Sequence, residues 1–183
     1  HYIELNELRK ELRGCNYILD LGCRDNSILS FVPGKVTVGL DIHSGSLEMA
    51  KANDTHDDYV LLNALDIDKK FLEKTFDAVV LLGLVEHMSK EDGLEVIRKA
   101  ERIAINKVIV STSNGFLEYG VNFSNPYELH ISEWSVAELK ELGFKVKGMH
   151  GHRCFNETVY SLKEPKIIYG ALSVMSHYFL TYR

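Results

Sequence analysis

Two acidic residues and a glycine in the first quarter of the chain have the types and spacing needed to hold a nucleotide. Asp20 closes an apolar run that begins at Tyr17, and Gly22 follows it in the sequence DLG. Asp41 closes a second apolar run, 21 positions after Asp20. At the carboxyl ends of two parallel strands, such a glycine lets backbone N–H groups approach a ligand, and the second carboxylate can accept both ribose hydroxyls. We therefore predict a nucleotide pocket at this edge of a sheet.

Strands and helices alternate along the chain, as such a pocket requires. Apolar runs predict strands at 17–21, 35–40, 59–62, 76–82, 107–111 and 144–149. Helical spacing and capping signals predict helices over 2–13, 46–52, 90–103 and 135–142, the last with Ser135 and Glu138 at capping-box spacing. The run FDAVVLL at 76–82 is typical of a central parallel strand buried on both faces. The alternation predicts an α/β, Rossmann-like fold, doubly wound, with a mostly parallel sheet and helices on both faces.

The C-terminal part is less regular. A long loop is expected over 113–132, and Thr158–Leu162 can form a strand. Residues 166–180 have helical spacing after Pro165, although Tyr178–Tyr182 can alternatively supply a strand. We interpret 1–183 as a single domain with its motifs at about 15–150, and we expect the tail at 151–183 to be incomplete.

Composition limits the classes of partner. The chain has a net charge of −5, so it lacks the basic field that holds nucleic acid, and we expect no nucleic-acid partner. Its three cysteines have no CxxC spacing, which excludes a disulfide framework or zinc ribbon and favours the reducing cytoplasm. No apolar run approaches the roughly 18–20 residues that span a bilayer.

Taken in order, these motifs resemble the class I S-adenosylmethionine-dependent methyltransferases, and among them the small type 11-like domains with a Glu-His pair after the fourth strand. The resemblance is carried by Asp20-Leu-Gly22, Gly39-Leu-Asp41, Asn63-Ala64, Gly83 to Met88 with Glu86-His87, and His130 to Phe144. It implies S-adenosylmethionine as cofactor, S-adenosylhomocysteine as product, and a small-molecule acceptor methylated at oxygen or nitrogen. It also implies a monomer or homodimer.

The resemblance further implies which residues form the site. Cofactor contacts are expected from Asp20, Gly22, Cys23, Arg24, Asp41, Ile42, Asn63, Ala64, Leu82 and Gly83. Of these, Asp20 is expected to hold the methionine ammonium directly or through a local network, and Asp41 the ribose. His87 and His130 are the candidate general bases, although His87 can equally order its loop.

Two positions depart from the family's Gly-x-Gly-x-Gly motif, because Arg24 and Asn26 replace the second and third glycines. Arg24 is strained if its φ is positive, whereas asparagine tolerates that conformation. This departure keeps open a second interpretation, a non-catalytic domain that binds S-adenosylmethionine or S-adenosylhomocysteine. A nicotinamide dehydrogenase is disfavoured, because its Gly-x-Gly-x-x-Gly motif fails at two of three places.

Two further groups of residues invite functional interpretations. The aromatic and polar residues of the long loop are expected to form an acceptor pocket or lid, with packing at a helix start as the alternative for Trp134; they are Tyr119, Phe123, Tyr127, His130 and Trp134. His150, His152 and Cys154 alternate as metal ligands can on a strand, but no second ligand cluster lies nearby in sequence, so we expect no metal.

Overall fold

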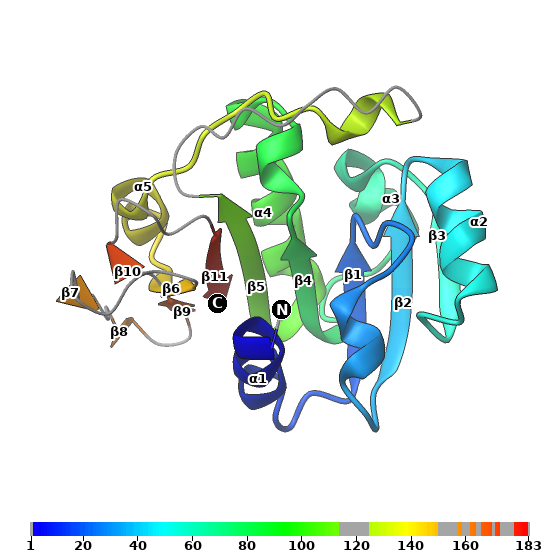
Figure 1. The fold of residues 1–183 in the computed structure, drawn as a ribbon, viewed down its shortest axis with the longest axis horizontal. Helices are drawn as coiled ribbons and strands as arrows, with labels where there is room; N and C mark the ends of the chain where they lie inside the picture. The colour runs from blue at the N-terminus through cyan, green and yellow to red at the C-terminus, as the bar shows by residue number, and fades with distance from the viewer. Residues whose placement is uncertain are drawn as a thin grey trace.

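In the computed structural model, a nine-stranded sheet in the order β3-β2-β1-β4-β5-β11-β6-β9-β8 forms the centre of the fold (Figure 1). The structure describes residues 2–113 and 125–149, together with 157–158, 162–163, 166–169, 171–172 and 178–182. All statements below concern these residues.

Five strands pair in parallel, and the first four family motifs lie at or just after the ends of the first four of them. They are β1 (Tyr17–Leu21), β2 (Val36–Asp41), β3 (Asp58–Leu61), β4 (Phe76–Leu82) and β5 (Ala104–Ser113). Beyond them, β11 (Tyr178–Tyr182) lies antiparallel between β5 and β6 (Lys145–Met149), and the sheet continues with β9 (Lys166–Tyr169) and β8 (Leu162–Lys163). A separate pair joins β7 (Glu157–Thr158) to β10 (Ala171–Leu172).

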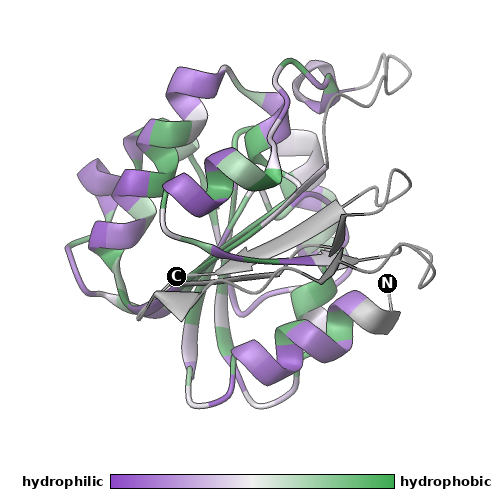
Figure 2. Ribbon diagram, turned by 90° about the vertical axis from the view of Figure 1, so that its left-hand side faces the viewer, coloured by the Kyte–Doolittle hydropathy of each residue, from purple (hydrophilic) through white to green (hydrophobic). Residues whose placement is uncertain are grey.

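Helices cover both faces of the sheet. They are α1 (Tyr2–Glu11), α2 (Ser44–Ala52), α3 (Ile67–Lys70), α4 (Lys90–Ile103) and α5 (Val136–Glu141), with short 3₁₀ turns η1 (Ile28–Phe31), η2 (Ala64–Asp66), η3 (Val85–His87) and η4 (Pro126–Glu128). Figure 2 shows α1, next to the N-terminus, on the opposite side of the sheet from most of the other helices.

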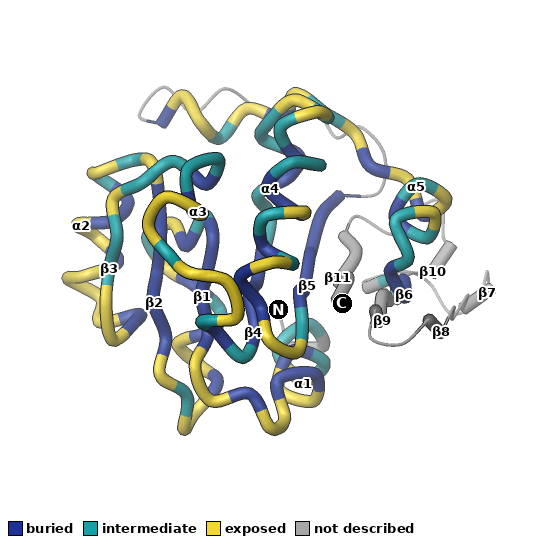
Figure 3. The backbone as a smooth tube through the Cα atoms, turned by 180° about the vertical axis from the view of Figure 1, so that it is seen from behind, coloured by how far each residue is buried: buried dark blue, intermediate teal, exposed yellow. Residues whose placement is uncertain are grey.

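Alternate residues of each central strand feed two separate cores. In β4, Val79 and Leu81 pack in the cluster under α4, whereas Ala78 and Val80 pack with Leu8 of α1. These residues are fully buried, and Figure 3 shows the central strands as the most buried part of the chain. Burial on both faces explains why the β4 sequence is nearly all apolar. The predicted doubly wound α/β fold is confirmed.

The register brings the carboxyl ends of the first strands together. Leu21 at the end of β1 lies opposite Leu40 of β2 and Leu81 of β4. The residues that follow these positions therefore meet at one edge of the sheet, as the two acidic motifs require.

One predicted element is wrong. The helix expected over 166–180 is replaced, where the structure describes this segment, by β9, β10 and β11. Its isoleucines, tyrosines and phenylalanine favour strands, and β5 offers a sheet edge that β11 covers along five residue pairs, from Tyr178 opposite Ser113 to Tyr182 opposite Ile109. The alternative strand at Tyr178–Tyr182 is confirmed. Among the described residues, no helix has the length and apolar character to cross a membrane.

Candidate active site

A cavity of about 300 Å³ opens where the parallel strands end. Its walls come from the segments after β1, β2, β3 and β4, and from the chain around η4, which runs along the top edge in Figure 1. The lining residues are Gly22, Arg24, Leu40, Asp41, Ile42, Asn63, Ala64, Leu65, Gly83, Leu84, His87, Met88, Ser89, Asp92, Asn125, Tyr127, Glu128 and Ile131. The cavity is within the range of about 300–1,000 Å³ that small-molecule sites occupy.

Gly22 occupies a position that favours glycine. Its φ is +72°, and a Cβ there would lie 2.8 Å from Cδ1 of Leu84. The N–H groups of Gly22 and Cys23 both bond to the carbonyl of Leu40, at 2.8 and 3.0 Å. The strand-to-loop turn is therefore tied to the end of β2, and it leaves backbone exposed at the cavity wall.

Arg24 adopts the positive φ that its place in the glycine motif suggested. Its φ is +55°, a region that costs a non-glycine residue roughly 1–2 kcal/mol. The guanidinium pairs with Glu128 Oε1 at 3.0 Å, joining the loop after β1 to η4. Asn26 is not among the residues with positive φ, so its replacement of a glycine carries no such cost.

Asp41 lies at the cavity and also anchors the loop beside it. One carboxylate oxygen accepts the N–H of Arg24 at 2.9 Å, and the other accepts the N–H of His43 at 2.8 Å. The residue is 7% exposed. Each oxygen keeps a second lone pair, so the carboxylate can still accept hydroxyl groups of a ligand.

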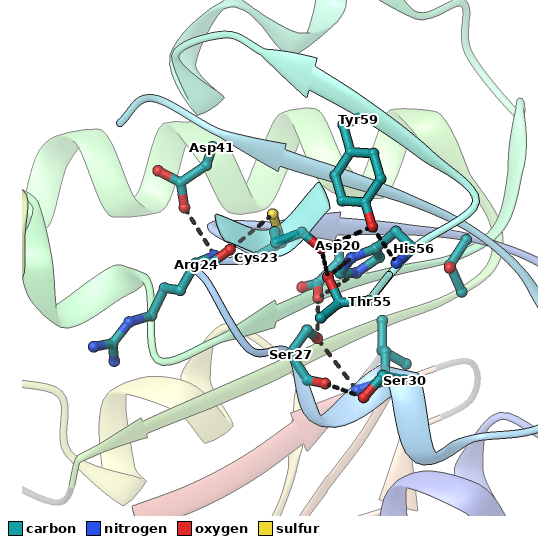
Figure 4. A network of polar contacts seen from close by, with 12 residues as sticks. Asp20, Cys23, Arg24, Ser27, Ser30, Asp41, Thr55, His56 and Tyr59 are labelled. Atoms are coloured by element: carbon teal, nitrogen blue, oxygen red, sulfur yellow. Dashed lines mark hydrogen bonds and ion pairs between the residues drawn. The ribbon is translucent and has the colours of Figure 1, made fainter. Parts of the chain in front are cut away.

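Asp20 lies beneath the cavity and does not line it. Its Oδ2 accepts the hydroxyl of Ser27 at 2.5 Å and lies 3.1 Å from Nε2 of His56, as Figure 4 shows. His56 is held in turn by Thr55, whose hydroxyl lies 2.9 Å from Nδ1. Asp20 therefore contacts Ser27 and His56, and its expected role toward the methionine ammonium, directly or through a local network, stays a prediction. Its Oδ1 is buried and has no hydrogen-bond partner among the described residues.

Two more predicted cofactor residues lie outside the cavity lining. Cys23 is 3% exposed, and its sulfur would lie 3.0 Å from a Cβ at Gly39. Burial raises the pKa of its thiol well above the usual range, and neighbouring carboxylates add to this effect, so the thiol stays neutral. Leu82 packs against the core cluster on the α1 side.

Seven of the predicted cofactor residues do line the cavity, namely Gly22, Arg24, Asp41, Ile42, Asn63, Ala64 and Gly83. Asn63 also serves as a turn residue, since its side-chain carbonyl accepts the N–H of Leu65 at 2.9 Å and caps η2. Ile42 is partly exposed.

The two candidate bases are in contact with each other, and one of them lines the cavity. His87 lines it, and His130 packs edge-to-face against His87 with ring centroids 4.7 Å apart. Burial lowers the pKa of His87, and Nδ1 lies 3.2 Å from the carbonyl of Leu129. Beside them Glu86 is 1% exposed, and burial raises its pKa to about 7.

The aromatic residues of the long loop have different roles. Tyr127 is half exposed and lines the cavity, as expected. Trp134 is 1% exposed and packs on Gly93 of α4, so its assignment to the acceptor pocket is wrong and packing at a helix start is correct. Tyr119, Phe123, and the run from His150 to Cys154 lie outside the described residues.

Several lining residues were not predicted from the sequence. Ser89 and Asp92 begin α4, where they read as an ordinary helix cap, and the serine does accept the N–H of Asp92 at 3.1 Å. Asn125 caps η4 locally, but the contacts of Asn125 with Ser46 and of Glu128 with Arg24 join segments far apart in the sequence, which no local pattern indicates.

These residues fit an adenosine-containing sulfonium ligand. At Gly22, a Cβ would come within 2.8 Å of Leu84, so the glycine keeps the turn open to a ligand. Asp41 lines the cavity at the end of the neighbouring strand, and Oδ1 of Asp20 is buried without a hydrogen-bond partner in the described part of the chain.

The chain is similar to known methyltransferases in sequence family and in fold. A family model described as a methyltransferase domain matches residues 19–111. A methyltransferase described as SAM-dependent, from Archaeoglobus fulgidus, is 17% identical with a TM-score of 0.64, over 97% of this chain and 93% of that one. The methyltransferase domain of the bacterial CtHen1-CN is 21% identical with a TM-score of 0.62, over 98% and 96%.

Magnesium protoporphyrin IX methyltransferase from Synechocystis, solved with bound SAM, is 14% identical with a TM-score of 0.60, over 98% of this chain and 78% of that one. Among curated protein sequences there is no match. At such low identity, the solved structures show the shared fold, and the family model covers just over half of the chain. The chain belongs to the methyltransferase domain family of class I, S-adenosylmethionine-dependent methyltransferases.

Proposed function

We propose that this chain transfers the methyl group of S-adenosylmethionine to an oxygen or nitrogen of a small-molecule acceptor. The observation that carries the proposal is that Gly22, Asp41 and His87 all line one cavity. When bound, the cofactor supplies an electrophilic methyl group on its sulfonium. The protein's part is to hold donor and acceptor in line and to exclude water.

The donor site is formed by two strand ends. The backbone at Gly22 can approach the ligand closely, and Asp41 can accept the ribose hydroxyls with the lone pairs that Arg24 and His43 leave open. Asn63 and Ala64, which follow β3, lie where adenine contacts are expected from the family resemblance.

The cavity wall also contains apolar and acidic side chains that an acceptor can contact. Met88, Tyr127 and Ile131 are apolar, and Asp92 and Glu128 carry carboxylates, of which Glu128 pairs with Arg24. Acidic groups disfavour a phosphorylated acceptor, which supports a neutral or cationic small molecule over nucleic acid.

His87 is the candidate base for an acceptor that keeps its proton at neutral pH. With its Nδ1 hydrogen donated to the carbonyl of Leu129, the ring carries its lone pair on Nε2. That nitrogen belongs to a residue of the cavity wall, where it can accept a proton from a hydroxyl or an amine.

Donor binding and turnover test the proposal in sequence. Calorimetry with S-adenosylhomocysteine is expected to give saturable binding, and radiolabelled donor is expected to label at least one member of a panel of small hydroxyl and amine acceptors. Absence of binding refutes the donor site. Tight product binding with no transfer to any acceptor favours the non-catalytic domain, which the strained Arg24 and its ion pair to Glu128 at the cavity wall motivate.

For His87→Ala we expect kcat to fall at least tenfold, because general-base catalysis contributes roughly 10²–10⁴-fold to a rate. The affinity for S-adenosylhomocysteine is expected to change less than about threefold. Equal losses in rate and affinity would assign His87 a purely structural role.

A further inference from the structure

Glu86, His87 and His130 form a compact cluster at the wall of the cavity. One carboxylate oxygen and one nitrogen of each imidazole lie within 4.8 Å of one another. Glu86 and His130 are buried, and His87 faces the cavity. Two imidazoles and one carboxylate, with the remaining positions open to a pocket, are a ligand set for zinc or another divalent first-row transition metal.

The backbone fixes the three side chains against one another. The carbonyl of Glu86 accepts the N–H groups of Ile131 and Ser132, at 2.9 and 3.2 Å. The carbonyl of Val85 accepts the Ser132 hydroxyl at 3.0 Å and the indole N–H of Trp134 at 3.2 Å. These four bonds hold the segment that carries His130 against η3, so the site is built on rigid backbone.

His87 has the hydrogen bond that a metal-binding histidine needs. Its Nδ1 lies 3.2 Å from the Leu129 carbonyl. Donation of the Nδ1 hydrogen to a carbonyl fixes the ring orientation and the tautomer, and leaves the Nε2 lone pair available to a cation.

Glu86 supplies an independent observation. Its carboxyl group is 1% exposed, and Oε2 has no hydrogen-bond partner among the described residues. A buried carboxylate oxygen without a partner is costly, and a bound cation would satisfy it.

We infer that Glu86, His87 and His130 bind a divalent transition metal ion at the wall of the cavity. Nitrogens around a tetrahedral zinc ion lie about 3.3 Å apart, so metal binding requires the side chains to rotate and bring the present ligand atoms, within 4.8 Å of one another, closer together. This inference goes beyond the proposed methyl transfer and does not depend on it. Because Nε2 of His87 cannot bind a metal and accept a proton together, metal loading also decides whether that nitrogen acts as the base.

Metal binding is measured on the full chain, stripped with a chelator and titrated with Zn²⁺ by calorimetry and with Co²⁺ by visible absorption. We expect one equivalent of each metal to bind at this cluster, with d–d bands of low-symmetry Co²⁺. His130→Ala and His87→Ala are each expected to weaken binding at least tenfold. Glu86→Gln, nearly isosteric, is expected to do the same and covers the case in which a histidine variant does not fold, as judged by circular dichroism.

A control variant removes the other potential metal ligands that the sequence analysis identified. A variant with His150→Ala, His152→Ala and Cys154→Ala is expected to keep this metal site at unchanged affinity. The inference is overturned if neither ion binds below millimolar concentration, if the triple variant abolishes binding, or if Glu86→Gln and the histidine variants bind as tightly as the native chain. Because no methyl donor is present, these outcomes are independent of the proposed activity.

Discussion

Asp41 bonds to the loop beside it and, in the proposed site, to the ribose of the ligand, so its replacement is expected to cost both stability and affinity. In Asp41→Ala, the N–H groups of Arg24 and His43 lose partners at 2.9 and 2.8 Å. Two part-buried donors left unsatisfied, at about 1–3 kcal/mol each, lower the free energy of unfolding by about 2–6 kcal/mol, and the lower end is expected because both hydrogen bonds are only partly shielded from water. If the carboxylate also accepts ribose hydroxyls, donor binding loses about 1.5–3 kcal/mol more, which is roughly 12- to 150-fold in Kd.

Asp77 provides a matched control at the opposite end of the sheet. Its Oδ2 also accepts two backbone N–H groups, from Asn16 at 2.8 Å and Tyr17 at 3.0 Å, and it lies near the start of β4, outside the cavity lining. Asp77→Ala is therefore expected to lower thermal stability without changing the Kd for S-adenosylhomocysteine.

A ligand analogue distinguishes direct contact from a distorted loop. Calorimetry with S-adenosylhomocysteine and with its 2′-deoxy analogue is expected to show a preference for the hydroxyl in the native chain. That preference is expected to become smaller in the milder Asp41→Asn variant, because a neutral amide oxygen accepts a hydroxyl more weakly than a carboxylate does. A preference of unchanged size after the substitution, or a Kd unchanged beside a clear loss of stability, would refute the ribose role and leave Asp41 as a loop anchor.

Three further predictions concern stability. Arg24→Gly removes a strain of about 1–2 kcal/mol but adds unfolded-state entropy and loses an exposed ion pair. The free energy of unfolding, obtained from a melting curve, is therefore expected to change by less than about 1 kcal/mol, and a loss above about 2 kcal/mol would contradict this balance. Backbone hydrogen bonds lower the pKa of Asp77, so its stabilising effect is present above about pH 4 and is lost as the pH falls through the lowered value; an acid titration of Asp77→Asn is expected to lack this part of the slope. Gly93→Ala puts a Cβ 2.7 Å from Cζ2 of buried Trp134, and overpacking of about 1–3 kcal/mol is expected to outweigh the gain in helix propensity in a denaturant titration.

Local patterns were sufficient to predict the elements near the site. The strand Phe76–Leu82 and the helix Lys90–Ile103 have the predicted bounds, and Ser135 and Glu138 form the predicted capping box. These features depend on residues close in sequence, which is why composition and spacing reveal them. The helix predicted over 166–180 was wrong because the apolar residues of this segment suit either a helical or a strand period. Pairing of its last part with β5, far along the chain, decides in favour of strands.

Contacts across the chain explain what the sequence could not show at the site. The Arg24 side chain meets Glu128, 104 positions away, and no periodicity indicates such a pair. His56, which holds Asp20 from below, likewise lies in a loop without a recognisable motif. The sequence predicted which strand ends form the cavity, but not which distant side chains close it.

The two acidic residues that first indicated a nucleotide pocket act on one loop from opposite sides. Asp20 holds it from inside the protein through Ser27 and His56, whereas Asp41 holds it at the cavity through the N–H of Arg24. With the loop fixed at both points, its shape does not depend on glycines at the second and third motif positions, and of these two positions only Arg24 takes a positive φ. The departure from the family motif therefore changes the charge at the cavity wall more than the path of the backbone, so its effect is expected in the relative affinities for the cationic donor and the neutral product.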